Sequence, residues 1–158
     1  DRLNGKKYLV IGNHDWRNLT PGVCQRFEHV SQQINSKIEG IHIWMNHFPF
    51  LCFSGAWKGM DASWQLFGHV HTSPYADTGL DHKRLDNLFT TQFDVGTDNN
   101  NFTPISFNEV KEKIKQNSRN YAKRQLTWFR RYDFVKWFDL YKTDEAIEYI
   151  LEKLQKKS

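Results

Sequence analysis

Short apolar runs that each end at a polar turn predict four β-strands. The runs are Lys7–Ile11, Ile41–Met45, Trp64–Phe67 and Thr91–Val95, and their length is typical of buried strands. Histidine or other polar residues follow the first three runs directly. Layered α/β folds carry their sites where strands end and loops diverge. The pattern therefore predicts an α/β fold with functional residues at the strand ends.

Between the first two predicted strands, apolar residues recur at close to a 3.6-residue spacing. They are Val23, Phe27, Val30 and Ile34. This spacing predicts a helix over Pro21–Lys37 with His29 on it as a structural residue. Farther along, Thr72–Asn87 is polar and contains Pro and Gly, which predicts a loop.

Capping signals predict two more helices. Ser106 and Glu109 have the spacing of a capping box, in which each side chain satisfies an amide of the other residue, so a helix should begin there. Its pattern continues to Phe129. The last helix is expected from Asp144 to Leu154, and Thr143 precedes it as a candidate cap.

The composition agrees with one folded domain. The 158 residues suffice for one modest core, and 39% apolar with 15% aromatic residues argue against disorder. No apolar run is long enough to span a membrane and no signal peptide is recognisable, so we expect a cytoplasmic protein without membrane contact. The chain starts without Met, as a fragment or processed product would. Cys24 and Cys52 are too few for a disulfide scaffold or thiolate zinc site and are expected to be buried.

Basic residues are concentrated in one part of the chain. Residues 1–110 hold nine Lys or Arg against eleven Asp or Glu, residues 111–136 hold nine against two, and residues 137–158 hold four against five. Such a block is typical of a contact with a phosphate backbone, and also of a solvated helix face.

Three short polar motifs follow the first three predicted strands. They are Gly12–Asp15, Asn46–His47 and Gly68–His71. Imidazoles and an amide oxygen suit ions such as Mn, Fe or Zn, and two ions roughly 3.5–4 Å apart can clamp a phosphoryl group. In order and spacing the motifs resemble those of the calcineurin-like metallophosphoesterase family, over residues 1–112.

This resemblance implies a partial layered β-sheet of the metallophosphoesterase fold and hydrolysis of phosphoric esters at a two-metal site. It implies Asn13, His47 and His69 as ligands of one metal and His71 as a ligand of the other. It also implies a catalytic pair, in which His14 acts on the substrate and Asp15 holds the His14 ring.

The sequence departs from that family in one respect. The family's upstream Asp-x-His and Gly-Asp motifs, which supply most ligands of the second metal and the bridging carboxylate, do not occur in the chain. Neutral ligands alone bind a divalent ion weakly. We therefore expect impaired metal binding and weak or no hydrolysis by this polypeptide.

A second resemblance covers residues 113–158. The run Tyr121–Arg130, followed by Trp137–Asp139, is similar to the C-terminal signature of bacterial tRNA dimethylallyltransferase. It implies contact with tRNA through the polar and aromatic side chains of the run, which are Lys123, Arg124, Gln125, Thr127, Trp128 and Arg130. The Gly-rich loop and catalytic acid of that family are absent, so prenyl transfer is not expected.

The two resemblances predict a truncated phosphoesterase domain over residues 1–112 and a C-terminal helical tail over residues 113–158. The junction falls inside a predicted helix, as an end-to-end join of two truncated genes would leave it. Three functions stay open: a phosphoesterase acting on a phosphoester substrate, an RNA-binding module, and a folded remnant with neither activity. Exposed sheet edges favour self-association.

Aromatic residues between the second and third predicted strands are numerous. They are Trp44, Phe48, Phe50, Phe53, Trp57, Trp64 and Phe67. We expect them to form core and pocket wall rather than a platform for nucleic-acid bases.

Overall fold

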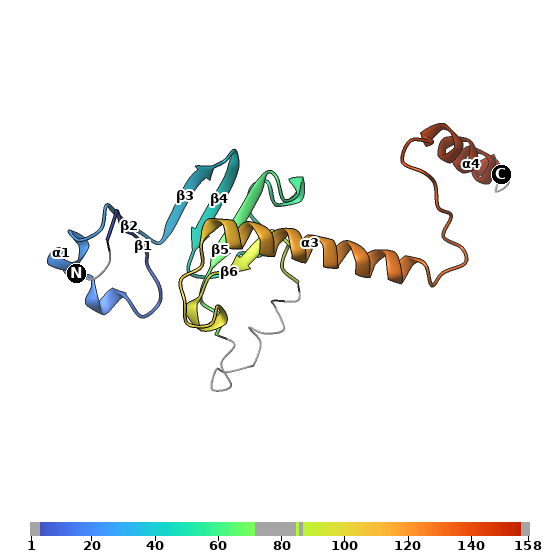
Figure 1. Ribbon diagram of the computed structural model, residues 1–158. Coiled ribbons are helices and arrows are strands. Elements are labelled where there is room, and N and C mark those ends of the chain that lie inside the picture. Colours follow the sequence, from blue (N-terminus) through green and yellow to red (C-terminus); the bar gives the residue numbers. More distant parts are fainter. Residues whose placement is uncertain (1–3, 72–84, 86, 156–158) are drawn as a thin grey trace. The chain divides into compact units, whose positions relative to one another are not determined.

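The computed structural model describes residues 4–71, 85 and 87–155 of the chain. It is mixed α/β, with two small sheets and two long helices (Figure 1), which confirms the predicted fold class at that level. The chain divides into two compact units, Asp1–Tyr121 and Ala122–Ser158. The loop predicted over Thr72–Asn87 lies almost entirely outside the described residues.

The first sheet has two parallel strands, β1 (Tyr8–Val10) and β2 (His29–Ser31). The connection between them carries a 3-10 turn, η1 (Trp16–Asn18), and one helical turn, α1 (Pro21–Cys24). Thr20 caps α1, because its Oγ1 accepts a hydrogen bond from the amide of Val23 at 3.4 Å. The β1 strand confirms the first predicted strand.

The helix predicted over Pro21–Lys37 is wrong beyond its first turn. The chain after α1 forms β2 and then β3 (Gln33–Ile38), so His29 lies in a strand. β3 pairs along its whole length with β4 (Ile41–Asn46), antiparallel. Val30 and Ile34 are β-branched and fit a strand as well as a helix stripe, and the pairing with β4 decides between the two.

A two-residue turn joins β3 to β4. Ile38 pairs with Ile41, and the residues between them, Glu39 and Gly40, have φ angles of 50° and 85°. Positive φ at both central residues is what a type I′ hairpin turn requires, and glycine adopts it without steric cost. The turn fixes the register of the β3–β4 hairpin.

The second sheet has the strand order β3-β4-β5-β6. β5 (Ser63–Phe67) and β6 (Gln92–Asp94) run parallel to β4, which confirms the remaining predicted strands. Parallel strands end at the same edge of a sheet, so the residues after β4 and β5 are brought together.

Helix α3 (Phe107–Phe129) closes the core over this sheet (Figure 1). Val110 and Ile114 are buried against Ile41, Ile43 and Trp64. The predicted helix start is confirmed in its capping contacts. Glu109 Oε2 accepts the Ser106 amide at 2.9 Å, and Ser106 Oγ accepts the Glu109 amide at 3.3 Å. The domain boundary expected after residue 112 falls inside α3 and stays a prediction.

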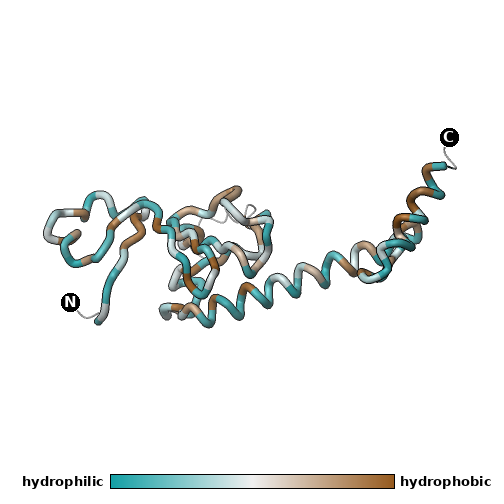
Figure 2. Tube along the Cα trace, turned by 90° about the horizontal axis from the view of Figure 1, so that it is seen from above, coloured by the Kyte–Doolittle hydropathy of each residue, from teal (hydrophilic) through white to brown (hydrophobic). Residues whose placement is uncertain are grey.

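The second unit contains helix α4 (Thr143–Gln155), which confirms the last predicted helix, with Thr143 as its first residue. Its Tyr149 ring packs at 5.5 Å from the ring of Phe138. Hydrophobic and hydrophilic positions alternate along both long helices (Figure 2). No helix among the described residues is long and apolar enough to cross a membrane.

Two expectations about burial are corrected. Cys24 is only half-buried and Cys52 is exposed, because both lie outside the strands that form the core. Of the aromatic residues between β4 and β5, Phe53, Trp64 and Phe67 are buried as expected. Phe48 and Trp57 are 46% and 74% exposed, so the aromatic cluster is core only in part.

Candidate functional site

Asn13, His47 and His69 converge where β1, β4 and β5 end. Asn13 Oδ1 lies 2.6 Å from His47 Nε2, and His69 Nδ1 lies 3.0 Å from the same nitrogen. Gly12 permits this approach, since a Cβ there would lie 3.0 Å from two atoms of the His47 ring. The structure therefore brings these three predicted ligands together.

The environment of His47 favours its neutral form. Burial lowers the pKa of His47 below its usual 6.5, and the neighbouring His69 lowers it further, while Asp15 acts in the opposite direction. A neutral imidazole can accept or donate one hydrogen bond at each nitrogen. Both Asn13 Oδ1 and His69 Nδ1 approach the same nitrogen, Nε2, so the neutral ring can form a hydrogen bond with only one of them at a time.

The other predicted catalytic and metal residues make separate contacts. Asp15 Oδ2 accepts a hydrogen bond from the Gly12 amide at 2.6 Å, which ties the turn after β1 to itself. His71 Nδ1 lies 2.8 Å from Asp98 Oδ2, with 60% of the His71 side chain exposed. The roles expected of His14, Asp15 and His71 stay predictions.

A metal ion would find a neutral donor set at His47. The cluster offers two imidazoles and one amide, and these polar atoms already contact one another. Among the described residues no group of three His, Cys, Asp or Glu could hold a metal ion. Binding of Mn, Fe or Zn by Asn13, His47, His69 and His71 stays a prediction.

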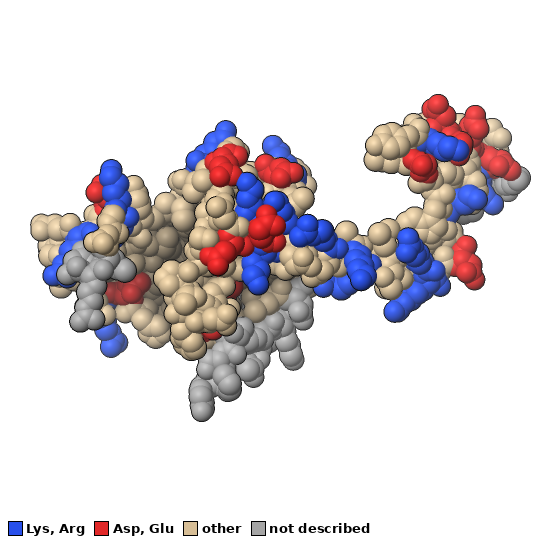
Figure 3. All heavy atoms as spheres, viewed as in Figure 1, with Lys and Arg blue, Asp and Glu red and all other residues tan. Residues whose placement is uncertain are grey.

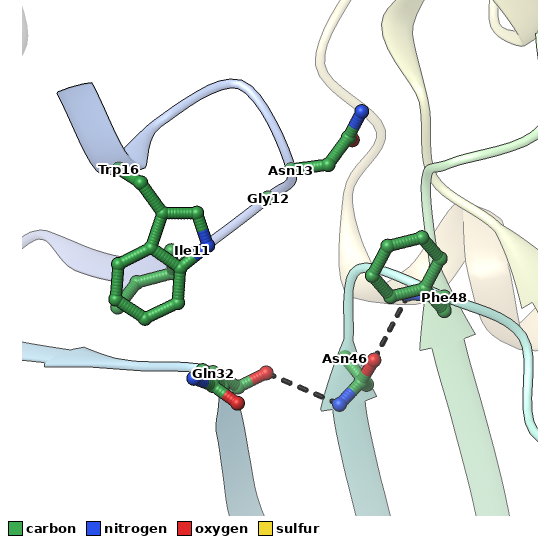
Figure 4. Close-up of a pocket in the computed structure, with 7 residues that line it drawn as sticks. All are labelled: Ile11, Gly12, Asn13, Trp16, Gln32, Asn46 and Phe48. Atoms are coloured by element: carbon green, nitrogen blue, oxygen red, sulfur yellow. Dashed lines mark hydrogen bonds between the residues drawn. The ribbon is translucent and has the colours of Figure 1, made fainter. Parts of the chain in front are cut away.

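A hollow of about 360 Å³ lies beside this cluster, between β1 and the end of β4. Figure 4 shows the indole of Trp16 and the ring of Phe48 on opposite sides of it, with the Asn13 side chain turned away from Trp16. Asn46 connects two segments that line the hollow. Its Nδ2 donates a hydrogen bond to Gln32 O at 3.1 Å, and its Oδ1 accepts one from the Phe48 amide at 2.9 Å.

The basic block lies on α3 and directly after it. Figure 3 shows Lys and Arg side chains following one another along this helix. Lys123, Arg124, Arg130 and Arg131 are exposed, and within residues 4–71, 85 and 87–155 none of the four forms an ion pair. From Lys115 to Tyr132 the sequence contains six basic residues and no acidic one.

Helix geometry separates these charges from the packed face of α3. Residues advance by about 100° around a helix, so positions four apart share a face. Lys115, Arg119 and Lys123 form one such row. Val110 and Ile114 point to roughly the opposite side, where they are buried. Arg119 and Lys123 are exposed, and Lys115 is half-buried.

The remaining residues of the predicted RNA-contact run are arranged around the end of α3. Gln125 is half-buried, and Thr127 Oγ1 donates to Lys123 O at 2.9 Å. Trp128 is 50% exposed, and its ring makes edge contacts with Phe129 at 4.9 Å and Tyr132 at 4.8 Å. Cations and exposed rings thus lie next to one another.

Sequence reasoning missed a buried amide network inside the second sheet. Gln65 and Gln92 are 0% and 6% exposed, and Gln92 Nε2 donates to Gln65 Oε1 at 2.5 Å. Gln65 Nε2 also donates to Phe48 O at 2.9 Å, and its Oε1 accepts the Phe50 amide at 3.0 Å. Two polar residues in facing strand positions gave no signal of burial.

Comparison with known proteins matches residues 64–132 to the IPP transferase family model. Similar proteins include the tRNA dimethylallyltransferase of Caldanaerobacter subterraneus subsp. tengcongensis, 53% identical over 58 residues, which are 32% of this chain and 18% of the relative. The Bacillus cereus (strain AH187) tRNA dimethylallyltransferase is 53% identical over 57 residues, 34% of this chain and 18% of its own. The tRNA dimethylallyltransferase of Geobacillus kaustophilus is 50% identical over 58 residues, which are 32% of this chain and 18% of that relative. No solved structure matches.

These matches correct the expected function. The prediction of a metal-dependent phosphoesterase acting on a phosphoester is wrong, because the family model and the relatives point to tRNA dimethylallyltransferase, and nothing in the comparisons supports a metallophosphoesterase segment. The histidine motifs are only two to four residues long, so their resemblance carries less weight than the match over residues 64–132. The chain spans about a fifth of the length of these relatives, 18%. Its supported resemblance is to the tRNA dimethylallyltransferase, or IPP transferase, family, over residues 64–132.

Proposed function

We propose that the chain binds RNA, with tRNA as the first candidate, through the exposed second half of α3 and the residues directly after it. One observation carries the proposal. Within the segment that matches the family model, Lys123, Arg124 and Arg130 are exposed, and no ion pair among the described residues engages them. The relatives are named for action on tRNA, which makes tRNA the natural partner to test.

Charge supplies the affinity in this proposal. Each cation that neutralises a phosphate releases a counterion, so binding weakens linearly on a log scale as salt rises, with a slope of roughly −0.7 to −0.9 per phosphate contact. Surface cations that are already paired within the protein would add little. Lys123 and Arg124, which form no ion pair with any described residue, are therefore better placed for phosphate contact than Lys142, whose Nζ lies 2.9 Å from Glu145 Oε1.

Aromatic residues add a contact for unpaired bases. RNA loops present unstacked bases, which proteins bind by stacking on aromatic rings. Trp128, Phe129 and Tyr132 form a connected ring cluster at the end of α3, with Trp128 half exposed. The order of the residues thus supports phosphate contact along the helix and base contact at its end.

The test compares two charge-matched triple variants. Lys123→Ala, Arg124→Ala and Arg130→Ala together should flatten the slope of log affinity against log salt by about one unit per lost phosphate contact. Lys37→Ala, Lys58→Ala and Lys142→Ala together change the net charge equally but lie outside α3, and should leave the slope close to wild type. Fluorescence anisotropy with a labelled tRNA transcript at several salt concentrations measures both. Equal slopes in the two variants would refute the interface.

The metallophosphoesterase sheet architecture over residues 1–112 and its ligand set remain predictions. What supports them is the convergence of Asn13, His47 and His69 at neighbouring strand ends. Self-association through the edge strands β3 and β6 likewise remains a prediction. No hydrolytic activity is proposed for the chain.

A further inference from the structure

We propose that the hollow between residues 99–105 and the first half of α3 holds one unpaired nucleotide of the RNA that α3 binds. The proposal rests on the RNA-binding function proposed above and adds a specific site to it. The hollow has a volume of about 630 Å³, within the range of roughly 300–1,000 Å³ that small-molecule sites occupy. All residues that line it belong to the unit Asp1–Tyr121.

The lining suits the edge and the face of a base. Asn101 and Gln116 bring side-chain amides to the hollow, and an amide offers both donors and an acceptor, as base edges require. Gln116 Nε2 donates to Asn120 Oδ1 at 3.0 Å, which leaves its second N–H for a ligand. Pro104 and Ile105 add apolar surface to the same hollow, against which a base can lie.

The lining carries two acidic and two basic side chains. Glu109 and Glu112 also border the hollow, but their carboxylates are engaged, by Ser106 at 2.6 Å and by Lys115 at 2.7 Å. Lys113 and Arg119 form no ion pair with any described residue. Arg119 is held near the amide of Gln116, at 3.4 Å. Lys113 and Arg119 thus offer cationic groups to a phosphate, and Glu109 and Glu112 act on them electrostatically from the same lining.

Helix geometry connects the hollow to the proposed RNA contact. Arg119 and Lys123 are one turn apart on the same face of α3, about 6 Å along the helix axis. The hollow therefore adjoins the proposed RNA contact in sequence.

The backbone on the other side of the hollow is held in an uncommon conformation. Asn101 and Phe102 have φ angles of 55° and 56°, in the left-handed region that bulky residues rarely adopt. Hydrogen bonds fix the turn, from the Phe102 amide to Thr97 O at 2.7 Å and from Asn100 Nδ2 to Gly96 O at 2.8 Å. Asn101 is therefore presented to the hollow on a rigid turn.

The experiment separates a base-binding site from general RNA affinity. A variant with Asn101→Gly and Gln116→Leu removes both amides, keeps the left-handed turn accessible and preserves helix propensity. Asn117→Leu is the matched control, because Asn117 is exposed on the next helical position and does not line the hollow. The probes are an RNA hairpin with a single-stranded loop and a fully paired duplex of the hairpin stem, both measured by fluorescence anisotropy.

The double variant should bind the hairpin about tenfold more weakly than wild type, equivalent to about 1.4 kcal/mol, and bind the duplex as wild type does. Asn117→Leu should bind both probes as wild type does. An equal loss on hairpin and duplex, or no loss on either, would overturn the nucleotide site. If the site fails while Lys123→Ala, Arg124→Ala and Arg130→Ala still weaken binding, the RNA-binding function stands. If that triple variant also binds as wild type does, both proposals fail.

Discussion

Replacing the buried Gln65 by Leu should destabilise the sheet although the volume of the side chain hardly changes. Gln65 is fully buried, and its amide bridges the segment after β4 to the core. Its Oε1 accepts the Phe50 amide at 3.0 Å and its Nε2 donates to Phe48 O at 2.9 Å. A leucine can do neither, so both backbone groups lose their partner.

The magnitude follows from the fate of those groups. A buried polar group left without a partner costs about 1–3 kcal/mol. Phe48 is 46% exposed, so water can replace the bond to its carbonyl, whereas the Phe50 amide is more enclosed. Gln92 keeps two hydrogen bonds in the variant. Its Nε2 donates to Phe50 O at 2.8 Å, and its Oε1 accepts the Phe89 amide at 2.8 Å. With the Phe50 amide left unpaired, we therefore expect a loss of about 1–3 kcal/mol in the free energy of unfolding.

Urea unfolding followed by tryptophan fluorescence measures this loss, since Trp64 is buried in the same sheet. Gln33→Leu is the matched control, because Gln33 is exposed on β3 and its replacement should change stability by at most about 0.5 kcal/mol. Gln65→Leu and Gln92→Leu together should cost less than the sum of the two single changes, because residues in one hydrogen-bond network couple. A strictly additive pair, or a Gln65→Leu protein as stable as wild type, would refute the network's role.

Two other predictions concern α3 and can be checked with the same assays. Trp128→Leu should weaken binding of a hairpin RNA by about 1–3 kcal/mol if a base stacks on the indole, while Trp57→Leu, at a more exposed indole outside α3, should not; equal affinities would exclude stacking at Trp128. Ser106→Ala should lower the free energy of unfolding by about 1 kcal/mol through loss of the helix cap. Ser106 also keeps the pKa of Glu109 below its usual 4.5, so this contact stabilises the protein above that pH and is lost as pH falls through the lower folded pKa. The difference in urea midpoint between wild type and Ser106→Ala should therefore be smaller at acidic pH, where Glu109 is protonated, than near neutral pH, and a constant difference would contradict the assignment.

Local sequence rules predicted the elements whose pattern has one interpretation. The strands β1, β4, β5 and β6 are apolar runs that stop at polar residues, and the start of α3 is marked by Ser106 and Glu109. In each case the residues that decide the structure are neighbours in sequence. The pattern that marks each element lies within a few residues, so the sequence alone was sufficient to predict it, although the strands pair with partners that the fold brings to them.

The segment after α1 has two interpretations, and distant residues choose between them. Val30, Ile34 and Ile38 are spaced four residues apart, which places them on one face of a helix. Residues separated by an even number of positions also share one face of a strand, so the spacing fits both structures. β3 gains a complete set of backbone partners from β4, which no local rule anticipates. Gln65 and Gln92 show the same limit, because each amide is satisfied only by a partner that the fold brings from elsewhere.

Motif reasoning brought Asn13, His47 and His69 together correctly, whereas the phosphoesterase function inferred from the motifs is wrong. Asn13, His47 and His69 do meet. The parallel strands β4 and β5 end at one edge and bring His47 and His69 together, whereas Asn13 follows β1 of the other sheet. Convergence of this kind follows from topology and is compatible with a hydrogen-bonded cluster as well as a metal site. The chemistry of a site therefore needs more than three polar side chains in proximity, and the longer match over residues 64–132 outweighs it.

The change in burial along α3 gives the proposed interface its physical basis. Val110 and Ile114 anchor the beginning of the helix in the core, whereas Tyr121, Leu126 and Phe129 are 39–49% exposed. Lys, Arg, Gln, Ala and Leu, which fill residues 122–126, are strong helix formers, and a helix already nucleated by packing extends at little cost. The basic row is thus formed before RNA arrives, so binding should require little ordering of the backbone. Its affinity should then follow the number of phosphates contacted, which is the quantity that the salt dependence measures.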